Sequence, residues 1–363
     1  MFFRNIWAEI RLLGNVFSGD NLPHASSRLS KMASLRLALA IVFLPSCLTD
    51  VAPAKYLLIS TPREAKILYV RVKQGGMEAT KEKPQTLVGG QLKAPQGLAV
   101  DVARSKLYVA DPDLKQIKAY KLFSSGDYLA VGDAQTAIDN VESRWVAVDS
   151  GGHVYATDEG KNLVLKQSLE NMARGNTTAD VIYDGKTVSG VSAPGGIAVD
   201  SYYTYWANKA TGTKAGSVVK GKTAPDLAAL QTSWMPIASN SDKTYGVCMA
   251  TNSIFYTQPD AILYGVKKRG GTPTVVSDRL TNPRGCAWDG DGTVYVADRG
   301  ANAVFSFAGN MQTIGAALVQ RAVTVDDAFG VAVYSGVHRH RAFGILALAV
   351  VALQVLAGFA VAN

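Results

Sequence analysis

The sequence contains few of the residues that build metal sites or active sites. Only four histidines occur among its 363 residues, and one of them, His153, lies between residues 55 and 336. A zinc site needs three or four nitrogen, sulfur or carboxylate ligands, so we expect no metal centre. No phosphate-binding loop, nucleophile elbow or cluster at metal-ligand spacing occurs. The sequence therefore offers no catalytic residue, and we interpret the chain as more consistent with a non-enzyme.

Charge is also sparse. Charged residues make up 18% of the chain and hydrophobic residues 48%, with a net charge of +8. Part of this charge lies in the end segments, and no basic run with interleaved aromatic residues occurs. We therefore predict no nucleic-acid partner. The charge is compatible with a mild attraction to anionic lipid or glycan.

What the sequence does contain is one short phrase in six copies. The first copy reads Gly97-Leu-Ala-Val-Asp101, and the others begin at Trp145, Gly196, Gly246, Gly285 and Gly330. The steps between starts are 48, 51, 50, 39 and 45 residues. A period of roughly 40–50 residues with β-rich content predicts propeller blades.

Each of the first five copies precedes further apolar runs, such as residues 107–111, 117–120 and 274–276. The runs are separated by Gly, Asp, Asn and Pro, which is typical of strands and turns, and four strands make a blade. The middle residue of the phrase is small in all six copies. We expect this because the first strand lies nearest the axis, where large side chains would overpack. We expect the leading glycine to permit a tight entry into that strand.

The two ends of this region complement each other. Residues 56–61, 67–72 and 86–88 supply three runs with no first strand, and residues 330–334 supply a first strand with nothing after it. We predict that they pair and complete one blade, which removes two exposed sheet edges. The predicted fold is an all-β, six-bladed propeller over residues 55–336, closed by a C-terminal first strand, with apolar segments at both ends.

The pattern of residues 94–101, then 107–111, then Ile117, resembles the NHL repeat, while residues 282–289 and 205–208 resemble the related YWTD repeat of lipoprotein-receptor propellers. The resemblance covers about residues 55–336. It implies a six-bladed propeller and leaves the function open, because such propellers include both enzymes and binding modules.

Residues 1–54 are predicted to be an N-terminal extension and a signal peptide. A basic segment beginning at Met32 precedes an apolar core at 37–44, and Ala52-Pro-Ala54 offers a small-residue cleavage site. Met1 and Met32 are alternative starts.

Residues 337–363 are predicted to be a basic spacer and a hydrophobic anchor or GPI signal. Residues 342–362 contain one polar side chain, Gln354, and are long enough to span a bilayer. Ser335, before a short polar spacer and an apolar tail, is the candidate GPI attachment site; a transmembrane helix is the alternative. We predict a location in the secretory pathway, at the cell surface or on a lumenal membrane. The rival interpretation is a cytosolic, tail-anchored scaffold.

Of the three cysteines, Cys47 would leave with the signal peptide, while Cys248 and Cys286 lie on first strands of adjacent blades. Two buried thiols and a disulfide are both consistent with this placement. Asn176-Thr-Thr178 is a glycosylation sequon in a polar loop, and we predict Asn176 as the glycosylated residue.

In propellers, the loops leading into first strands and those joining second to third strands open on one face around the axis. The candidate ligand-binding residues on this face are Gln96, Arg144, Tyr245, Arg284, Phe329 and Arg299. An anionic small molecule or an acidic peptide end would fit between Arg144 and Arg284; the alternative is that the arginines are solvated rim residues. Asp111, Asp158 and Asp298 are expected to cap their loops.

The predicted function is a membrane-tethered extracellular or lumenal module that binds a protein, peptide or glycan, with no cofactor. The enzyme alternative is a hydrolase or lyase similar to gluconolactonases or strictosidine synthases, with calcium or another metal on the axis. Against it, the residues leading into the first strands carry no carboxylate, and no glutamate matches the strictosidine-synthase position. The zinc site of peptide-amidating lyases is rich in histidine, which this region lacks.

Overall fold

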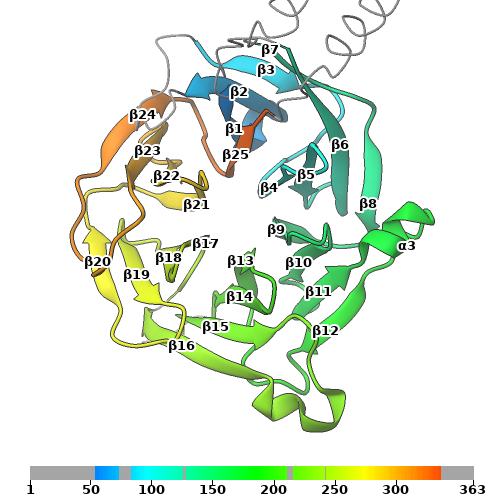
Figure 1. The fold of residues 1–363 in the computed structure, drawn as a ribbon, viewed down its shortest axis with the longest axis vertical. Coiled ribbons are helices and arrows are strands. Elements are labelled where there is room, and N and C mark those ends of the chain that lie inside the picture. The colour runs from blue at the N-terminus through cyan, green and yellow to red at the C-terminus, as the bar shows by residue number, and fades with distance from the viewer. Residues whose placement is uncertain (1–53, 73–82, 126–127, 211–215, 242, 337–363) are drawn as a thin grey trace, which may run out of the picture. The chain divides into compact units, whose positions relative to one another are not determined.

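The computed structural model describes residues 54–72, 83–125, 128–210, 216–241 and 243–336 (Figure 1). The predicted signal peptide and anchor lie outside these ranges. Within them, no helix has the length and hydropathy that crossing a membrane would require.

The described residues form six antiparallel sheets around an axis, which confirms the all-β, six-bladed propeller. We number the blades along the chain and give strands from the axis outward. Blade 1 is β25 (Val331–Ser335), β1 (Lys55–Thr61), β2 (Lys66–Val72) and β3 (Gln85–Val88). Blade 2 is β4 (Leu98–Asp101), β5 (Lys106–Asp111), β6 (Gln116–Ser125) and β8 (Gln135–Asp139), with β7 (Tyr128–Val131) added on β6. Blade 3 is β9 (Ser143–Val148), β10 (Val154–Asp158), β11 (Leu163–Gln167) and β12 (Asp180–Asp184).

The remaining blades repeat this order. Blade 4 is β13 (Pro194–Val199), β14 (Tyr203–Asn208), β15 (Gly216–Lys222) and β16 (Trp234–Ser241). Blade 5 is β17 (Val247–Ala250), β18 (Ser253–Thr257), β19 (Leu263–Lys267) and β20 (Thr274–Ser277). Blade 6 is β21 (Pro283–Trp288), β22 (Thr293–Asp298), β23 (Ala303–Ala308) and β24 (Gln320–Thr324). In the described part of the chain, short helices occur in three connections: η1 (Pro62–Glu64), α3 (Leu169–Ala173) and η2 (Leu227–Thr232).

The ring closes as predicted. β25 pairs antiparallel with β1, from Lys55 opposite Ser335 to Ile59 opposite Val331. The pairing continues beyond the strands, because the Gly336 amide donates to the Ala54 carbonyl at 3.0 Å. The last phrase therefore supplies the innermost strand of a blade whose other strands come from the start of the propeller.

Blade 2 contains a strand that the repeat pattern did not predict. β6 runs on past the four-stranded blade and turns back as β7, with Leu122 opposite Val131 and Ser125 opposite Tyr128. Leu122 and Leu129 are buried in the same apolar cluster as Tyr56 and Tyr334 of blade 1. The β6–β7 hairpin therefore covers part of the neighbouring, closing blade.

The apolar core lies between blades rather than within them. Six clusters of buried residues occur, one at each contact between adjacent blades. The small residue of each phrase faces the next blade: Ala99 packs in the cluster between blades 2 and 3, and Ala147 in the one between blades 3 and 4. The preceding residue faces the previous blade, because successive side chains of a strand point to opposite faces.

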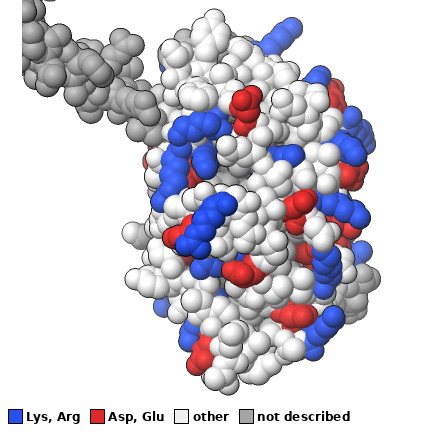
Figure 2. All heavy atoms as spheres, turned by 90° about the vertical axis from the view of Figure 1, so that its right-hand side faces the viewer, with Lys and Arg blue, Asp and Glu red and all other residues white. Residues whose placement is uncertain are grey.

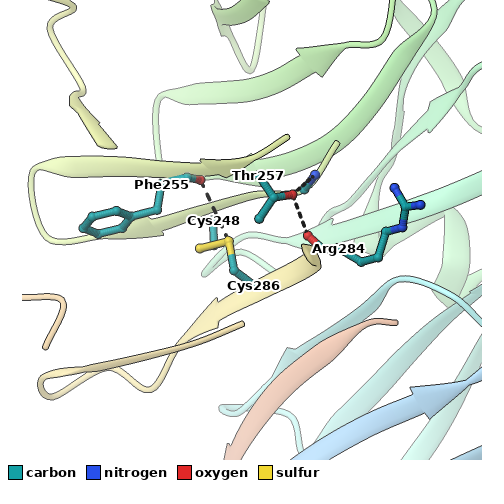
Figure 3. Close-up of a disulfide and its surroundings, with 6 residues drawn as sticks. Cys248, Phe255, Thr257, Arg284 and Cys286 are labelled. Carbon is teal, nitrogen blue, oxygen red and sulfur yellow. Dashed lines mark hydrogen bonds between the residues drawn. A yellow bond between two sulfur atoms is a disulfide. The ribbon is translucent and has the colours of Figure 1, made fainter. Parts of the chain in front are cut away.

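This alternation explains the two cysteines. Cys248 occupies the small position of blade 5 and faces blade 6, whereas Cys286 occupies the preceding position of blade 6 and faces blade 5. They form a disulfide with a Cα–Cα distance of 5.5 Å (Figure 3). The two alternatives left by the sequence resolve to the cross-blade disulfide.

The leading glycines have a different role from a tight backbone turn. None of Gly97, Gly196, Gly246, Gly285 and Gly330 has a positive φ in the described chain. A Cβ on Gly246 would lie 2.1 Å from the Arg284 carbonyl oxygen, and one on Gly330 would lie 2.1 Å from the Gln96 carbonyl oxygen. Glycine is therefore needed because the backbone of the next blade approaches too closely for any side chain.

Candidate functional site

Two faces of the propeller are distinguished by their loops. The top face carries the loops that lead into first strands and those that join second to third strands. The bottom face carries the turns that join first to second strands and the connections from third to fourth strands. Between them, an axial cavity of about 200 Å³ is lined by the six first strands, with mostly small or aliphatic side chains such as Ala99, Ala147 and Val199 on its walls.

Aromatic rings lie at the top end of this cavity. The rings of Trp145 and Phe329 are 5.5 Å apart, and the two residues are 7% and 8% exposed. Tyr245 is half-buried and packs against the same cluster. Together these three residues form an aromatic cluster at the axial part of the top face, and the half-buried Tyr245 ring is its accessible surface.

Arg284 stacks on this aromatic surface. Its guanidinium carbon lies 4.3 Å from the centre of the Tyr245 ring. The backbone beneath is fixed by Thr257, whose hydroxyl donates to the Arg284 carbonyl at 2.8 Å and accepts from the Gly246 amide at 2.9 Å (Figure 3). The backbone and ring contacts therefore hold Arg284 in place while its side chain extends away from the disulfide.

Arg284 differs from its cationic neighbours in having no counter-ion. Within the described residues it makes no ion pair, and its buried Nε finds no hydrogen-bond acceptor. A buried guanidinium nitrogen without an acceptor is costly. Arg284 as a whole is partly exposed, so an anionic ligand group has access to its side chain.

Arg144 and Lys209 are already paired. The Arg144 guanidinium lies 3.6 Å from a carboxylate oxygen of Glu142 and 3.6 Å from one of Glu159. Lys209 also forms an ion pair with Glu159, and its ammonium lies 5.9 Å from the centre of the Tyr245 ring. Arg144 stands on blade 3 and Arg284 on blade 6, on opposite sides of the axis (Figure 1).

Arg299 and Phe329 form a second group. The Arg299 Nε donates to the buried Asp327 carboxylate, and the guanidinium carbon lies 6.0 Å from the Phe329 ring centre. Asp327 also accepts from the Arg63 amide at 2.8 Å. Arg299 is therefore engaged in holding two top-face loops together.

Gln96 is buried beside the axis. Its carbonyl accepts from the Ser60 hydroxyl, and its side-chain Oε1 has no donor within the described part of the chain. This acceptor is buried, as the Arg284 Nε is.

The loop-capping role of the second-strand aspartates is confirmed. Asp111 is fully buried and accepts from the amides of Lys93, Ala94 and Leu114. Asp298 accepts from four amides, those of Thr281, Asn282, Gly300 and Ala301. Asp158 accepts from the Lys161 and Glu142 amides. Because these carboxylates are saturated with backbone donors, they shape the loops rather than face a ligand.

Carboxylates on the bottom side are also occupied. Lys55 is 5% exposed, and its ammonium lies 2.8 Å from Asp289 and 2.6 Å from Asp291, which joins blade 1 to blade 6. Burial opposes ionisation of Asp289, but hydrogen bonds with Asp291, Lys55 and two backbone amides lower its pKa to about 2. In blade 2, by contrast, burial raises the pKa of the Tyr108 hydroxyl to about 12, and the nearby Asp101 carboxylate adds to this rise.

Among the residues that the structure describes, no three His, Cys, Asp or Glu side chains converge as metal ligands would. The outer edge seen from the side carries basic and acidic side chains of both signs interspersed (Figure 2).

The sequence had singled out Tyr245 and Arg284 separately, without the stacking that joins them. It had not predicted Trp145 as a site residue. Its signal was present nonetheless, because Trp145 is the one phrase start that is not glycine.

Comparisons with known proteins identify the fold. No family model matches the sequence, and no curated protein matches it. Among solved structures, the chain is similar to one in a nidogen/laminin complex, with 15% identity, a TM-score of 0.60, and coverage of 77% of this chain and 98% of that one. It is also similar to a gluconolactonase from Xanthomonas campestris, with 13% identity, a TM-score of 0.50, and coverage of 79% and 93%. At these identities the likeness establishes the six-bladed propeller and nothing about activity.

Proposed function

We propose that the chain is a membrane-tethered, NHL-type propeller that binds an acidic group of a protein, peptide or glycan on its top face. The observation that carries the proposal is the Arg284 guanidinium, stacked on Tyr245 and without a counter-ion among the described residues. A partly desolvated arginine beside an aromatic surface binds a carboxylate with charge-assisted hydrogen bonds. The half-buried Tyr245 ring adds apolar contact area next to that charge.

The charged residues of the top face favour ligand binding over catalysis. Every other top-face cation described above is neutralised by Glu142, Glu159 or Asp327, so one arginine stands out as the anion site. The structural neighbour in the nidogen/laminin complex comes from an assembly of two proteins, and we propose the same class of partner for this chain.

Three features support a location outside the cytosol. The signal-peptide and anchor patterns of the sequence predict it. The Cys248–Cys286 disulfide belongs to the kind of bond that persists in oxidising compartments. Asn176 is exposed, and its side-chain oxygen accepts from the Thr178 amide at 2.9 Å in an open turn.

Ligand binding is tested with immobilised acidic peptides rich in Asp and Glu, and the same peptides with Asn and Gln. Only the acidic peptides should retain the wild-type chain, and its retention should fall as the salt concentration rises. Arg284→Gln should abolish retention, while Arg63→Gln, which removes a 75% exposed top-face arginine, should leave it unchanged. Equal binding of both peptide sets would refute the proposal, as would a tightly held stoichiometric metal at the axis with a hydrolytic activity.

The location is tested separately in secreting cells. Asn176→Gln should abolish a glycosidase-sensitive shift in electrophoretic mobility, and phospholipase release from the membrane would distinguish a GPI anchor from a transmembrane helix. A chain without a glycan in both forms would favour the cytosolic, tail-anchored alternative.

A further inference from the structure

The exposed apolar side chains of the propeller are distributed unevenly. Nine large hydrophobic residues are exposed within the described chain, and none lies in a top-face loop. Three of them, Val181, Met235 and Val275, lie on the outermost strands of blades 3, 4 and 5. The other six lie in bottom-face connections or in the hairpin built on one: Val102, Phe123, Tyr128, Tyr202, Leu227 and Leu318.

These six residues belong to alternate blades. Val102 and the β6–β7 hairpin are in blade 2, Tyr202 and Leu227 in blade 4, and Leu318 in blade 6. The most exposed residue of each blade is Tyr128 at 71%, Leu227 at 80% and Leu318 at 76%. Three points spaced around a ring define a plane, here one that crosses the propeller axis.

The hairpin shows how such exposure is built. One of its faces buries Leu122 and Leu129 against blade 1, so the opposite face carries Lys121, Phe123 and Tyr128. Blade 4 has the same combination, because the Lys220 ammonium lies 3.8 Å from the ring centre of Tyr203, next to Tyr202. Aromatic rings with lysines beside them are typical of side chains at a membrane interface.

Both ends of the described propeller leave on this side. β1 begins and β25 ends at the bottom, where Gly336 bonds to Ala54. A Cβ on Gly336 would lie 2.9 Å from the Ser124 hydroxyl of the hairpin. The apolar residues 342–362 follow only a few positions later, so any bilayer that they enter lies close to the hairpin.

We propose that the bottom face is a lipid-contacting surface, which seats the propeller on the membrane through the hairpin of blade 2 and the connections of blades 4 and 6. The inference rests on the membrane tether of the proposed function. Because the three contacts are spaced around the propeller axis, they keep this axis along the bilayer normal. The top face, which carries Arg284, then points away from the lipid. Asn176 lies outside these three contacts, in the β11–β12 connection of blade 3, where the adjacent Thr177 carbonyl accepts from the Asp139 amide of the outermost strand β8.

The test uses the full chain reconstituted in phosphatidylcholine vesicles containing phosphatidylserine. Tryptophan reporters are placed on the bottom face by Phe123→Trp, Leu227→Trp and Leu318→Trp. Val181→Trp is the matched control, since it is a similarly exposed apolar residue on an outermost strand. Lipids brominated at acyl-chain positions close to the headgroup should quench the fluorescence of the tryptophan added at each of the three bottom positions. They should leave the fluorescence of the tryptophan added in the control unchanged.

Flotation of the vesicles separates the two ways of failing. A chain that floats with the vesicles while its bottom reporters stay unquenched overturns the seat and leaves the tether standing. That result is also what a bottom face used for protein docking would give, because the vesicles contain no partner. A chain that does not float overturns the tether, and the seat with it.

Discussion

The guanidinium carbon of Arg284 lies 4.3 Å from the centre of the Tyr245 ring, in a contact that joins blade 6 to blade 5 beside the propeller axis. Tyr245 precedes the first strand of its blade, and Arg284 lies at the start of the next one. The stack therefore connects equivalent positions of two successive repeats.

The stack should be measurable as a coupling energy. Arg284→Ala and Tyr245→Ala should each destabilise the fold, and the double variant should lose less than the sum by about 0.5–2 kcal/mol, which is typical of cation–π pairs. Chemical denaturation of the four proteins measures this. The pair Arg63 and Tyr245, which has no such contact, serves as the additive control; additivity for Arg284 as well would contradict the stack.

The leading glycines should be intolerant of even one carbon. In Gly246→Ala the new Cβ would meet the Arg284 carbonyl oxygen at 2.1 Å, so we expect a loss of about 1–3 kcal/mol or more in the free energy of unfolding. A Cβ added at Gly315 would have no neighbouring atom within 4 Å, and this glycine has no positive φ, so Gly315→Ala should change stability by less than about 0.5 kcal/mol. Equal effects at the two positions would argue against the close approach of adjacent blades.

The disulfide should contribute strongly to stability. It closes a segment with a sequence separation of 38 residues, for which loop entropy predicts about 4 kcal/mol and measured bonds commonly give about 2–4 kcal/mol. Reductant should lower the midpoint of denaturation of the wild-type chain by a corresponding amount. The double variant Cys248→Ala and Cys286→Ala should be insensitive to reductant, and a wild-type midpoint that also ignores it would show that the bond is not formed.

Stability should fall on acidification through Asp289. Its pKa in the folded protein, about 2, lies below the ordinary value of 3.8, so the folded state binds this proton less readily than the unfolded chain does. The resulting stabilisation is complete above about pH 4 and is lost as pH falls toward 2. Asp289→Asn should remove this part of the pH dependence and destabilise the protein at neutral pH, because Lys55 loses a buried partner. Asp180→Asn, at an exposed carboxylate, is the control, and an unchanged acid limb in Asp289→Asn would contradict the assignment.

The repeats made the propeller predictable because the first strand of every blade packs in the same way beside the axis. Ala99 and its five equivalents had to be small, and their spacing along the chain was enough to predict the number of blades. Closure by residues 330–334 followed from the same logic, since a ring leaves no unpaired first strand. The disulfide needed one further fact, that adjacent positions of a strand face opposite neighbours.

The features without a repeat were out of reach. Phe123 and Tyr128 lie on a hairpin that only blade 2 contains among the described residues, so no other copy indicated that β6 would continue. The contact between the Trp145 and Phe329 rings joins residues 184 positions apart, from blades that are not neighbours in the ring. Such contacts depend on how first strands converge at the axis, which spacing along the chain does not encode.

The composite blade also sets the order of assembly during synthesis. Blades 2 to 6 each come from one continuous stretch of chain and can form as they are made, whereas β1 must wait for β25, about 275 residues later along the chain. Until Val331–Ser335 is synthesised, β1 has an unpaired edge. The Gln96 carbonyl also lacks the close packing against Gly330 that it has in the closed ring. A chain truncated before this strand would thus be an open ring with an unpaired strand edge, which is prone to aggregation. Synthesis of these five residues is therefore the step that allows the ring to close.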